Sequence, residues 1–228
     1  AWRLISNLAQ LYAKLNDSDK AIRHHELAFT VASEINSDIS CAISLNNLGT
    51  IYEEIGEKQK AADYYSKALE YQKEQGDRNI QSMLLNNLGS VLTDLGSFED
   101  AQICFDESLG ISREVKDLAG EARTLNNLAV LLEKQQQLDR AVRIYQEAET
   151  ILEAIGDIRR ELTTLINIAS VAWRNHDDEI GRAAFYKAWD LALKESFHNE
   201  LAILFQLRGD WSAFYRNSKT LAKRWYQK

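Results

Sequence analysis

Residues 44–56 read SLNNLGTIYEEIG, and their pattern returns as LLNNLGSVLTDLG at residues 84–96 and as TLNNLAVLLEKQQ at residues 124–136. A constant interval of this kind indicates an internal repeat, which decides the architecture before any other feature. Aligning the whole chain at a spacing of 40 places one asparagine at the same point five times, at Asn7, Asn47, Asn87, Asn127 and Asn167. The sequence therefore holds five copies of one unit without an insertion.

Small residues recur in the second half of each copy. One series is Ala21, Ala61, Ala101, Ala141 and Gly181, and the other is Ala28, Ala68, Ser108, Ala148 and Ala188. In copy 2, apolar residues follow helical spacing from Ala42 to Ile55, and Gly56 is placed to end that helix. A second stripe then runs from Ala61 to Tyr71. Each copy is therefore predicted to be a pair of helices that approach closely at small residues.

One helix pair cannot bury its own apolar face, so successive copies have to stack. A four-helix bundle or a coiled coil would also show apolar helical stripes, but neither requires the same residues at a fixed interval of 40. The chain has 228 residues and no proline, which favours helices because interior proline disrupts them. We expect an all-α fold, a right-handed α-solenoid of antiparallel helix pairs, with five copies in residues 1–196.

Residues 197–228 fit a degenerate sixth copy, in which Phe205 and Gly209 keep the register but Leu221 replaces a small residue. This segment is rich in basic residues, which are Arg208, Arg216, Lys219, Lys223, Arg224 and Lys228. Two interpretations remain open. We favour a C-terminal cap, because the end of an array needs a wettable outer face. The alternative is a basic docking patch.

Composition and charge narrow the classes of partner. The formal net charge of −7 argues against a nucleic acid, because phosphate binding requires a basic surface. No segment approaches the run of roughly 20 apolar residues that crosses a membrane, so no membrane partner is expected. The two cysteines, Cys41 and Cys104, form no CxxC pair and indicate thiols in a reducing compartment. We therefore expect a cytoplasmic protein.

No catalytic motif is found, and neither GxxxxGK nor GxGxxG occurs. His24 and His25 are adjacent, so on a helix they point about 100° apart and cannot bind one metal ion together. The acidic run from Asp177 to Glu179 is more typical of a solvated turn than of a calcium loop. We expect a protein that is not an enzyme and that needs no cofactor and no metal.

The order of these residues resembles the tetratricopeptide repeat. Copy 2 shows the pattern in Leu45, Leu48, Gly49, Tyr52, Ala61, Tyr65 and Ala68. The unit of 40 residues exceeds the usual 34 and is similar to a long-repeat branch. That branch includes kinesin light chains, the LGN/Pins polarity adaptors, and arrays in bacterial signalling ATPases and peptide-sensing regulators. The resemblance implies a protein or peptide partner.

The five equivalent asparagines, which we call the asparagine ladder, are the main candidate site. Asparagine forms helices poorly, so its recurrence inside predicted helices calls for another reason. A carboxamide offers donors and an acceptor that suit a peptide backbone. The resemblance implies that the second asparagine of each pair lines a concave groove and contacts an extended peptide. We add the preceding asparagines, which are Asn46, Asn86 and Asn126. The alternative is that these amides join neighbouring repeats.

The resemblance also carries basic residues over to the predicted groove, among them Arg123, Lys134 and Arg174. The sequence thus predicts a scaffold that binds an extended peptide or partner protein in its groove. An alternative from another class is the ligand-sensing, regulatory arm of a larger signalling ATPase or transcription regulator, suggested by the absence of an initial methionine and of an evident N-terminal cap.

Overall fold

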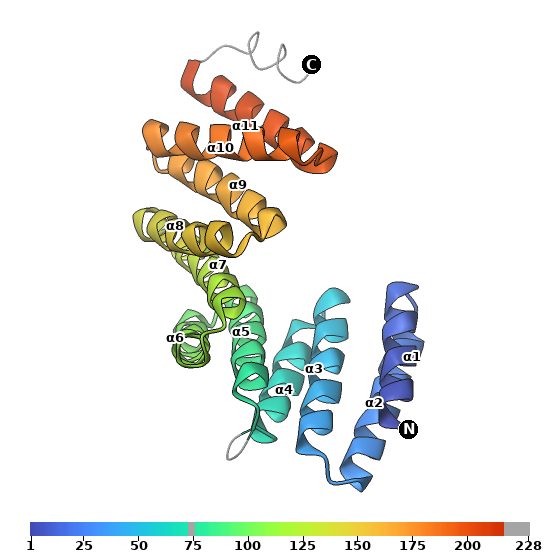
Figure 1. The fold of residues 1–228 in the computed structure, drawn as a ribbon. Helices are drawn as coiled ribbons and strands as arrows, with labels where there is room; N and C mark the ends of the chain where they lie inside the picture. Colours follow the sequence, from blue (N-terminus) through green and yellow to red (C-terminus); the bar gives the residue numbers. More distant parts are fainter. Residues whose placement is uncertain (73–75, 217–228) are drawn as a thin grey trace. The chain divides into compact units, whose positions relative to one another are not determined.

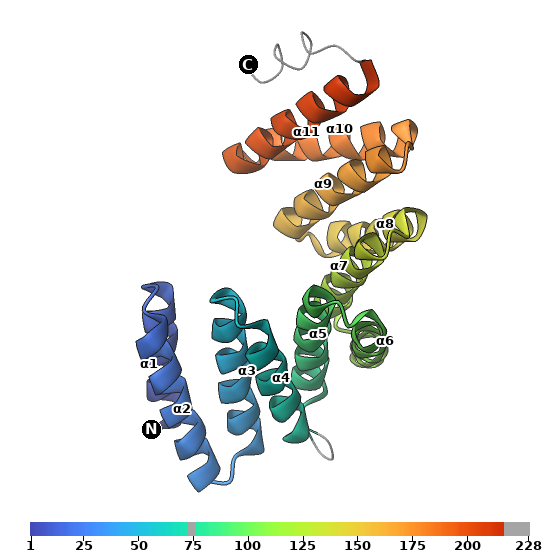
Figure 2. The same ribbon diagram turned by 180° about the vertical axis from the view of Figure 1, so that it is seen from behind.

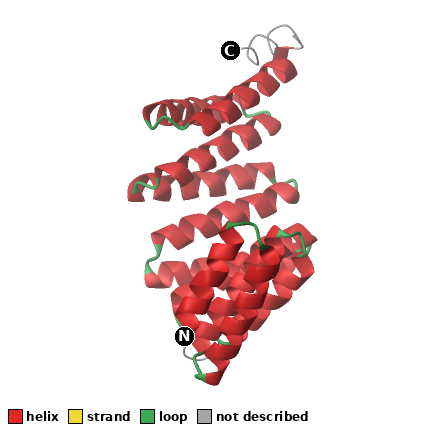
Figure 3. Ribbon diagram, turned by 90° about the vertical axis from the view of Figure 1, so that its right-hand side faces the viewer, coloured by secondary structure: helices red, strands yellow, loops and turns green. Residues whose placement is uncertain are grey.

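The computed structural model describes residues 1–72 and 76–216, with side chains as far as residue 209. All regular secondary structure in these ranges is helical (Figure 3). The helices are α1 (Trp2–Lys14), α2 (Ser18–Glu34), α3 (Asp38–Glu54), α4 (Lys58–Glu70), α5 (Arg78–Leu95), α6 (Phe98–Val115), α7 (Leu118–Lys134), α8 (Leu138–Ile155), α9 (Ile158–Arg174), α10 (Asp178–Lys194) and α11 (His198–Arg216).

The chain forms two compact units, Ala1–Asn127 and Leu128–Lys228. In the first unit each helix from α1 to α6 packs against the next (Figures 1 and 2). In the second unit α8 packs on α9, α9 on α10, and α10 on α11. Successive packing of helix pairs is the arrangement of an α-solenoid. The expected all-α fold of stacked antiparallel helix pairs is therefore confirmed.

Residues with a left-handed backbone follow most of the helices and recur at intervals of 20. Gly56 has a φ of 84°, as the sequence predicted for the end of α3. Only three of these positions are glycine, at Gly56, Gly96 and Gly156. The others are Asn16, Asn36, Lys116, Gln136, His176 and Ser196. Each copy of 40 residues thus consists of two helix-and-turn halves of equal length.

Aspartate or serine directly after several of these turns starts the next helix. The Asp17 side chain accepts a hydrogen bond from the backbone N–H of Lys20, and the Asp177 side chain accepts one from that of Ile180. Ser37, Asp77 and Asp157 cap their helices in the same way. These contacts satisfy N–H groups that have no partner within the helix.

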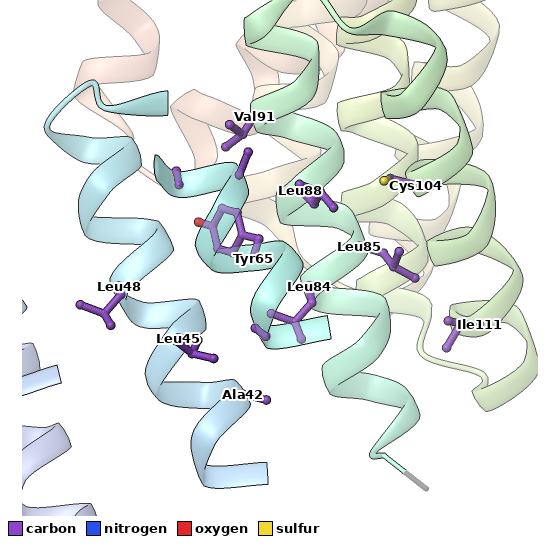
Figure 4. Close-up of a cluster of buried hydrophobic side chains, with 13 residues drawn as sticks. Ala42, Leu45, Leu48, Tyr65, Leu84, Leu85, Leu88, Val91, Cys104 and Ile111 are labelled. Atoms are coloured by element: carbon purple, nitrogen blue, oxygen red, sulfur yellow. The ribbon is translucent and has the colours of Figure 1, made fainter. Parts of the chain in front are cut away.

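The recurring small residues lie where helices meet. Both series are fully buried from copy 1 to copy 4, so the predicted close contacts are confirmed. Figure 4 shows Tyr65 of α4 among buried side chains of α3 and α5. A Cβ atom added to Gly49 would lie 2.6 Å from the Tyr65 ring, and one added to Gly89 would lie 2.7 Å from the Phe105 ring. Glycine thus leaves room for the aromatic ring of the second helix in copies 2 and 3, whereas copies 4 and 5 have alanine at this position.

Helix α11 begins the segment that was predicted to be a degenerate sixth copy. Its Leu204 is fully buried, and the Arg208 guanidinium lies 5.8 Å from the centre of the Phe185 ring. The other basic residues of this segment lie outside the described side chains, as does Leu221. These basic residues are Arg216, Lys219, Lys223, Arg224 and Lys228. The choice between a cap and a basic patch stays a prediction.

Candidate functional site

The asparagine ladder occupies the middle of the first helix of each copy, on α1, α3, α5, α7 and α9. Asn7 is exposed, and the other four members are half-buried. Of the preceding asparagines, Asn46 and Asn86 are buried and Asn126 is half-buried. Buried amide groups are normally hydrogen-bonded, so the partners of these side chains show what they do in the fold.

Amides of the ladder join consecutive copies within the first unit. Nδ2 of Asn87 donates to Oδ1 of Asn46 at 3.0 Å, and Nδ2 of Asn127 donates to Oδ1 of Asn86 at 3.0 Å. Nδ2 of Asn86 in turn donates to Oδ1 of Asn87 at 3.3 Å. Asn126 differs, because its Nδ2 donates to the backbone carbonyl of Ala122 at 3.0 Å. Joining of neighbouring repeats, which the sequence left as an alternative, is therefore one role of these residues.

The series of hydrogen bonds between asparagine side chains is interrupted at Asn47. Its Nδ2 atom is buried and has no hydrogen-bond partner among the described residues. The residue equivalent to Asn46 in copy 1 is Ser6, which is buried but has no carboxamide oxygen. Asn47 thus lacks the acceptor that Asn87 and Asn127 find. An unsatisfied buried donor costs about 1–3 kcal/mol.

We expect Ser6→Asn to raise the free energy of unfolding by about 1 kcal/mol, because the new carboxamide gives Asn47 an acceptor. Urea denaturation followed by circular dichroism measures the change. Ser6→Ala is the matched control, because alanine supplies no acceptor and should give no such gain. A variant with asparagine that is no more stable than the one with alanine would contradict this account of Asn47.

The three predicted basic residues differ in their surroundings. Arg123 and Lys134 lie on α7, the first half-buried and the second exposed. Arg174, at the end of α9, forms an ion pair of 2.6 Å with Glu133. The charge of Arg174 is thus largely neutralised within the second unit.

Two buried tyrosines bind glutamates in a way that the sequence analysis missed. The Tyr65 hydroxyl donates to Glu53 at 2.9 Å, and the Tyr145 hydroxyl donates to Glu133 at 2.7 Å. Burial raises the pKa of Glu53, although the hydrogen bond from Tyr65 opposes this rise. Copies 3 and 5 carry phenylalanine instead of tyrosine and have no glutamate at the paired position. This joint change between copies is the signal that could have revealed the pairs.

Lys187 of α10 lies among three carboxylates, which the sequence analysis also missed. Its Nζ contacts Glu149, lies 3.0 Å from Glu153, and lies 3.5 Å from the buried Glu161. Burial alone would lower the pKa of Lys187, but hydrogen bonds to Glu149 and Glu153 raise it above its ordinary value. Burial raises the pKa of Glu161, and Lys187 opposes that effect. The cluster connects α8, α9 and α10.

Two recesses lie at equivalent places beside the second helices. One, of about 510 Å³, is lined by residues that include Phe29, Tyr64 and Tyr71. The other, of about 230 Å³, is lined by residues that include Glu149 and Lys187. No member of the asparagine ladder lines either recess.

The residues considered for metal binding have roles in the fold. Burial lowers the pKa of His25 to about 4, with a smaller effect of His24, so its imidazole is neutral at pH 7. Asp177 caps α10, and Asp178 pairs with Arg182. None of the helices in the described part of the chain is long and apolar enough to cross a membrane.

Known structures share this fold. BtubC (BKLC) from P. vanneervenii has a TM-score of 0.77 and 26% identity over 84% of this chain and 80% of that one. A kinesin light chain-like repeat protein of Podospora anserina has a TM-score of 0.71 and 14% identity over 85% of this chain and 95% of that one. The Rap conjugation gene regulator of plasmid pLS20, solved with the Phr* peptide, has a TM-score of 0.72 and 18% identity. The match covers 98% of this chain and 61% of that one.

Comparison with curated protein sequences gives no match. The family model of the tetratricopeptide repeat matches residues 3–74 and 80–154, which is more than half of the chain. These matches confirm the resemblance drawn from Leu45, Gly49, Tyr65 and the residues equivalent to them. The chain belongs to the tetratricopeptide repeat family.

Proposed function

We propose that this protein is an interaction scaffold that binds an extended segment of a partner protein along its first helices. In this proposal the asparagine ladder holds the main chain of the segment. The Rap regulator, which shares the fold at 18% identity, was solved with a peptide. That precedent supports a peptide as the class of ligand.

The observation that carries the proposal is the unused bonding capacity of the ladder. Asn87 and Asn127 each donate one hydrogen bond from Nδ2 to an asparagine of the preceding copy. A carboxamide has two N–H donors, so one remains on each of these half-buried side chains. A donor held at the same place in consecutive repeats suits an extended chain, whose carbonyl groups recur regularly.

Basic residues on α7 suggest which segments bind best. Arg123 lies four residues before Asn127 and Lys134 lies seven after it, so all three share one face of the helix. Their charge favours a segment with an acidic side chain near its contact with Asn127. Arg174 adds little to this preference, because Glu133 already neutralises its charge.

The test compares alanine variants of the two asparagine sets. A peptide selected from a displayed random library against the wild-type protein serves as the probe, and fluorescence anisotropy gives its Kd. Replacing Asn87 and Asn127 together should weaken binding roughly five-fold to 150-fold, at about 0.5–1.5 kcal/mol per hydrogen bond if the contributions add. The same variant should unfold at lower urea concentration, because it also loses bonds between repeats.

The control replaces the acceptors Asn46 and Asn86 with alanine. This variant loses the same bonds between repeats but keeps the second asparagines, so it should lose stability and retain its affinity within about two-fold. Equal loss of affinity in both variants would contradict the proposal, because the amides would then act through the fold alone. Failure to select any peptide whose affinity depends on these residues would also contradict the proposal.

A further inference from the structure

The recess of about 510 Å³ in the first unit is lined by three aromatic rings, and we call it the aromatic recess. Its walls come from α2 and α4, which both pack on α3 (Figure 1). Phe29 belongs to α2, Tyr64 to α4, and Tyr71 directly follows α4. All three side chains are half-buried, and the rings of Phe29 and Tyr71 meet at an angle of 81°. The volume of this recess is within the range of ligand pockets.

The packing of the repeat does not require these aromatic residues. The places of Phe29, Tyr64 and Tyr71 hold aliphatic residues or cysteine in the two equivalent sets that follow, which are Leu69, Cys104 and Ile111, and then Leu109, Ile144 and Ile151. Helices α4, α5 and α6 pack in succession with the smaller residues of the first of these sets. A local departure from the pattern of a fold often marks a functional site. The three rings therefore indicate a role beyond packing.

Two carboxylates accompany the rings. Glu26 of α2 and Glu70 of α4 line the aromatic recess, and both side chains are exposed. Neither forms an ion pair within the described ranges. The places of Glu26 and Glu70 hold Ser66 and Gly110 in the next equivalent set, which has no such pair of acids. Rings and carboxylates thus occur together at this recess.

A cation suits these groups better than an anion does. Burial is the main cause that raises the pKa of Tyr64 and of Tyr71, and Glu26 adds to the rise at Tyr64 as Glu70 does at Tyr71. Negative charge therefore acts on both hydroxyl groups. Aromatic faces also attract cations, and Nζ of Lys67 already lies 5.5 Å from the centre of the Tyr64 ring. Lys67 supplies one positive charge against two glutamates.

The equivalent recess of the second unit shows how the chain itself can place a cation there. Lys187, the residue equivalent to Lys67, lines that recess of about 230 Å³ and contacts Glu149. Lys67 makes no ion pair with any carboxylate that the structure describes. The carboxylates of the larger, aromatic recess are thus not neutralised by a cation of the described chain.

We propose that the aromatic recess binds an arginine side chain of a partner protein. A planar guanidinium stacks on an aromatic ring and donates in more than one direction, here to Glu26 and Glu70, which suits it better than the compact ammonium of lysine. No arginine of the described residues lines the recess. The recess lies beside the second helices and contains no member of the asparagine ladder, so this surface does not depend on the proposed peptide site.

The first experiment determines which side chains the recess selects. Peptides of a displayed random library are first depleted on a variant that lacks the rings and are then selected on the wild-type protein. The variant is Phe29→Leu with Tyr64→Ile and Tyr71→Ile, in which each new residue is one that another copy has at the equivalent place. It should therefore fold, and circular dichroism checks its helix content. The peptides that remain should share an arginine.

The second experiment measures the Kd of one selected peptide by fluorescence anisotropy. Glu26→Gln with Glu70→Gln should weaken binding about two- to thirty-fold, in the range of two exposed ion pairs. Replacing the peptide's arginine with glutamine should remove this difference between variant and wild type. Lys67→Gln should bind at least as tightly as the wild type, because it removes a like charge. Glu99→Gln with Glu107→Gln is the matched control, since both glutamates are exposed on α6 outside the recess, and it should leave the Kd unchanged.

Asn87→Ala with Asn127→Ala separates this surface from the proposed peptide site and should also leave the Kd of the selected peptide unchanged. Loss of affinity in that variant would place the peptide on the asparagine ladder and overturn the assignment of the recess. Absence of any peptide that depends on the rings would overturn it too, as would acidic peptides whose binding Lys67→Gln weakens.

An equal loss of affinity in the Glu99 and Glu107 control would attribute binding to overall charge and contradict a specific recess. Self-association of the protein in sedimentation experiments, lost in the variant without the rings, would make a second copy the occupant and contradict a partner protein.

Discussion

Replacing Gly89 with leucine is expected to lower the free energy of unfolding by about 3 kcal/mol or more, beyond ordinary overpacking. A Cβ atom at this position would lie 2.7–3.0 Å from three atoms of the Phe105 ring. The ring is fully buried and cannot move away without displacing its neighbours. The better helix propensity of leucine returns only about 0.8–1 kcal/mol. Urea denaturation followed by circular dichroism measures the difference.

Gly110→Leu is the matched control, because it makes the same substitution at a position where no neighbouring side chain crowds the helix. Gly110 lies within α6 and is exposed, and a Cβ atom added to it would meet no neighbouring atom within 4 Å. This variant should therefore gain about 0.5–1 kcal/mol from helix propensity. Gly89→Ala should fall between the two, since Ala129 and Ala169 occupy the equivalent position in copies 4 and 5. A small loss for Gly89→Leu would mean that Phe105 does not pack against this glycine in solution.

Much of the fold could be predicted because each position of the repeat occurs several times in the sequence, so the copies support one another. Five asparagines and two series of small residues in one register left little choice of architecture, and Gly56 marked a helix end correctly. The ends at Lys116 and Gln136 were not evident, because these residues ordinarily avoid a positive φ. Their regular spacing could have revealed them, since they stand at positions where other copies have glycine or asparagine.

The side-chain partners were harder to predict than the backbone. A repeat period shows which residues are equivalent, but contacts between copies also depend on how each copy is rotated on the last. Helix propensity indicated that the asparagines have a special role, yet it could not distinguish bonds to Asn46 and Asn86 from bonds to a peptide. Lys187 was missed for a similar reason, because its three glutamates come from two other helices.

Replacing Lys187 with methionine is expected to lower the free energy of unfolding by about 1–3 kcal/mol at pH 7. Removing one partner of a buried ion pair can cost about 3–5 kcal/mol, and the 41% exposure of the Lys187 side chain reduces that figure through solvent screening. Glu161 bears most of the loss, because its side chain is only 7% exposed. Without Lys187, the carboxylates of Glu149, Glu153 and Glu161 would repel one another.

The pH dependence identifies the cause of this loss. Burial raises the pKa of Glu161 in the folded protein above its usual 4.5, and losing Lys187 removes an interaction that lowers it. A carboxyl group with a raised folded pKa destabilises the fold when it is ionised, and the penalty disappears as the pH falls through that pKa. The deficit in unfolding free energy of the Lys187→Met variant should thus be largest near pH 7 and shrink toward pH 4.5. Adding Glu161→Gln should remove most of the deficit and its pH dependence. A deficit that is constant with pH would instead mean that Lys187 stabilises the fold through packing of its aliphatic stem.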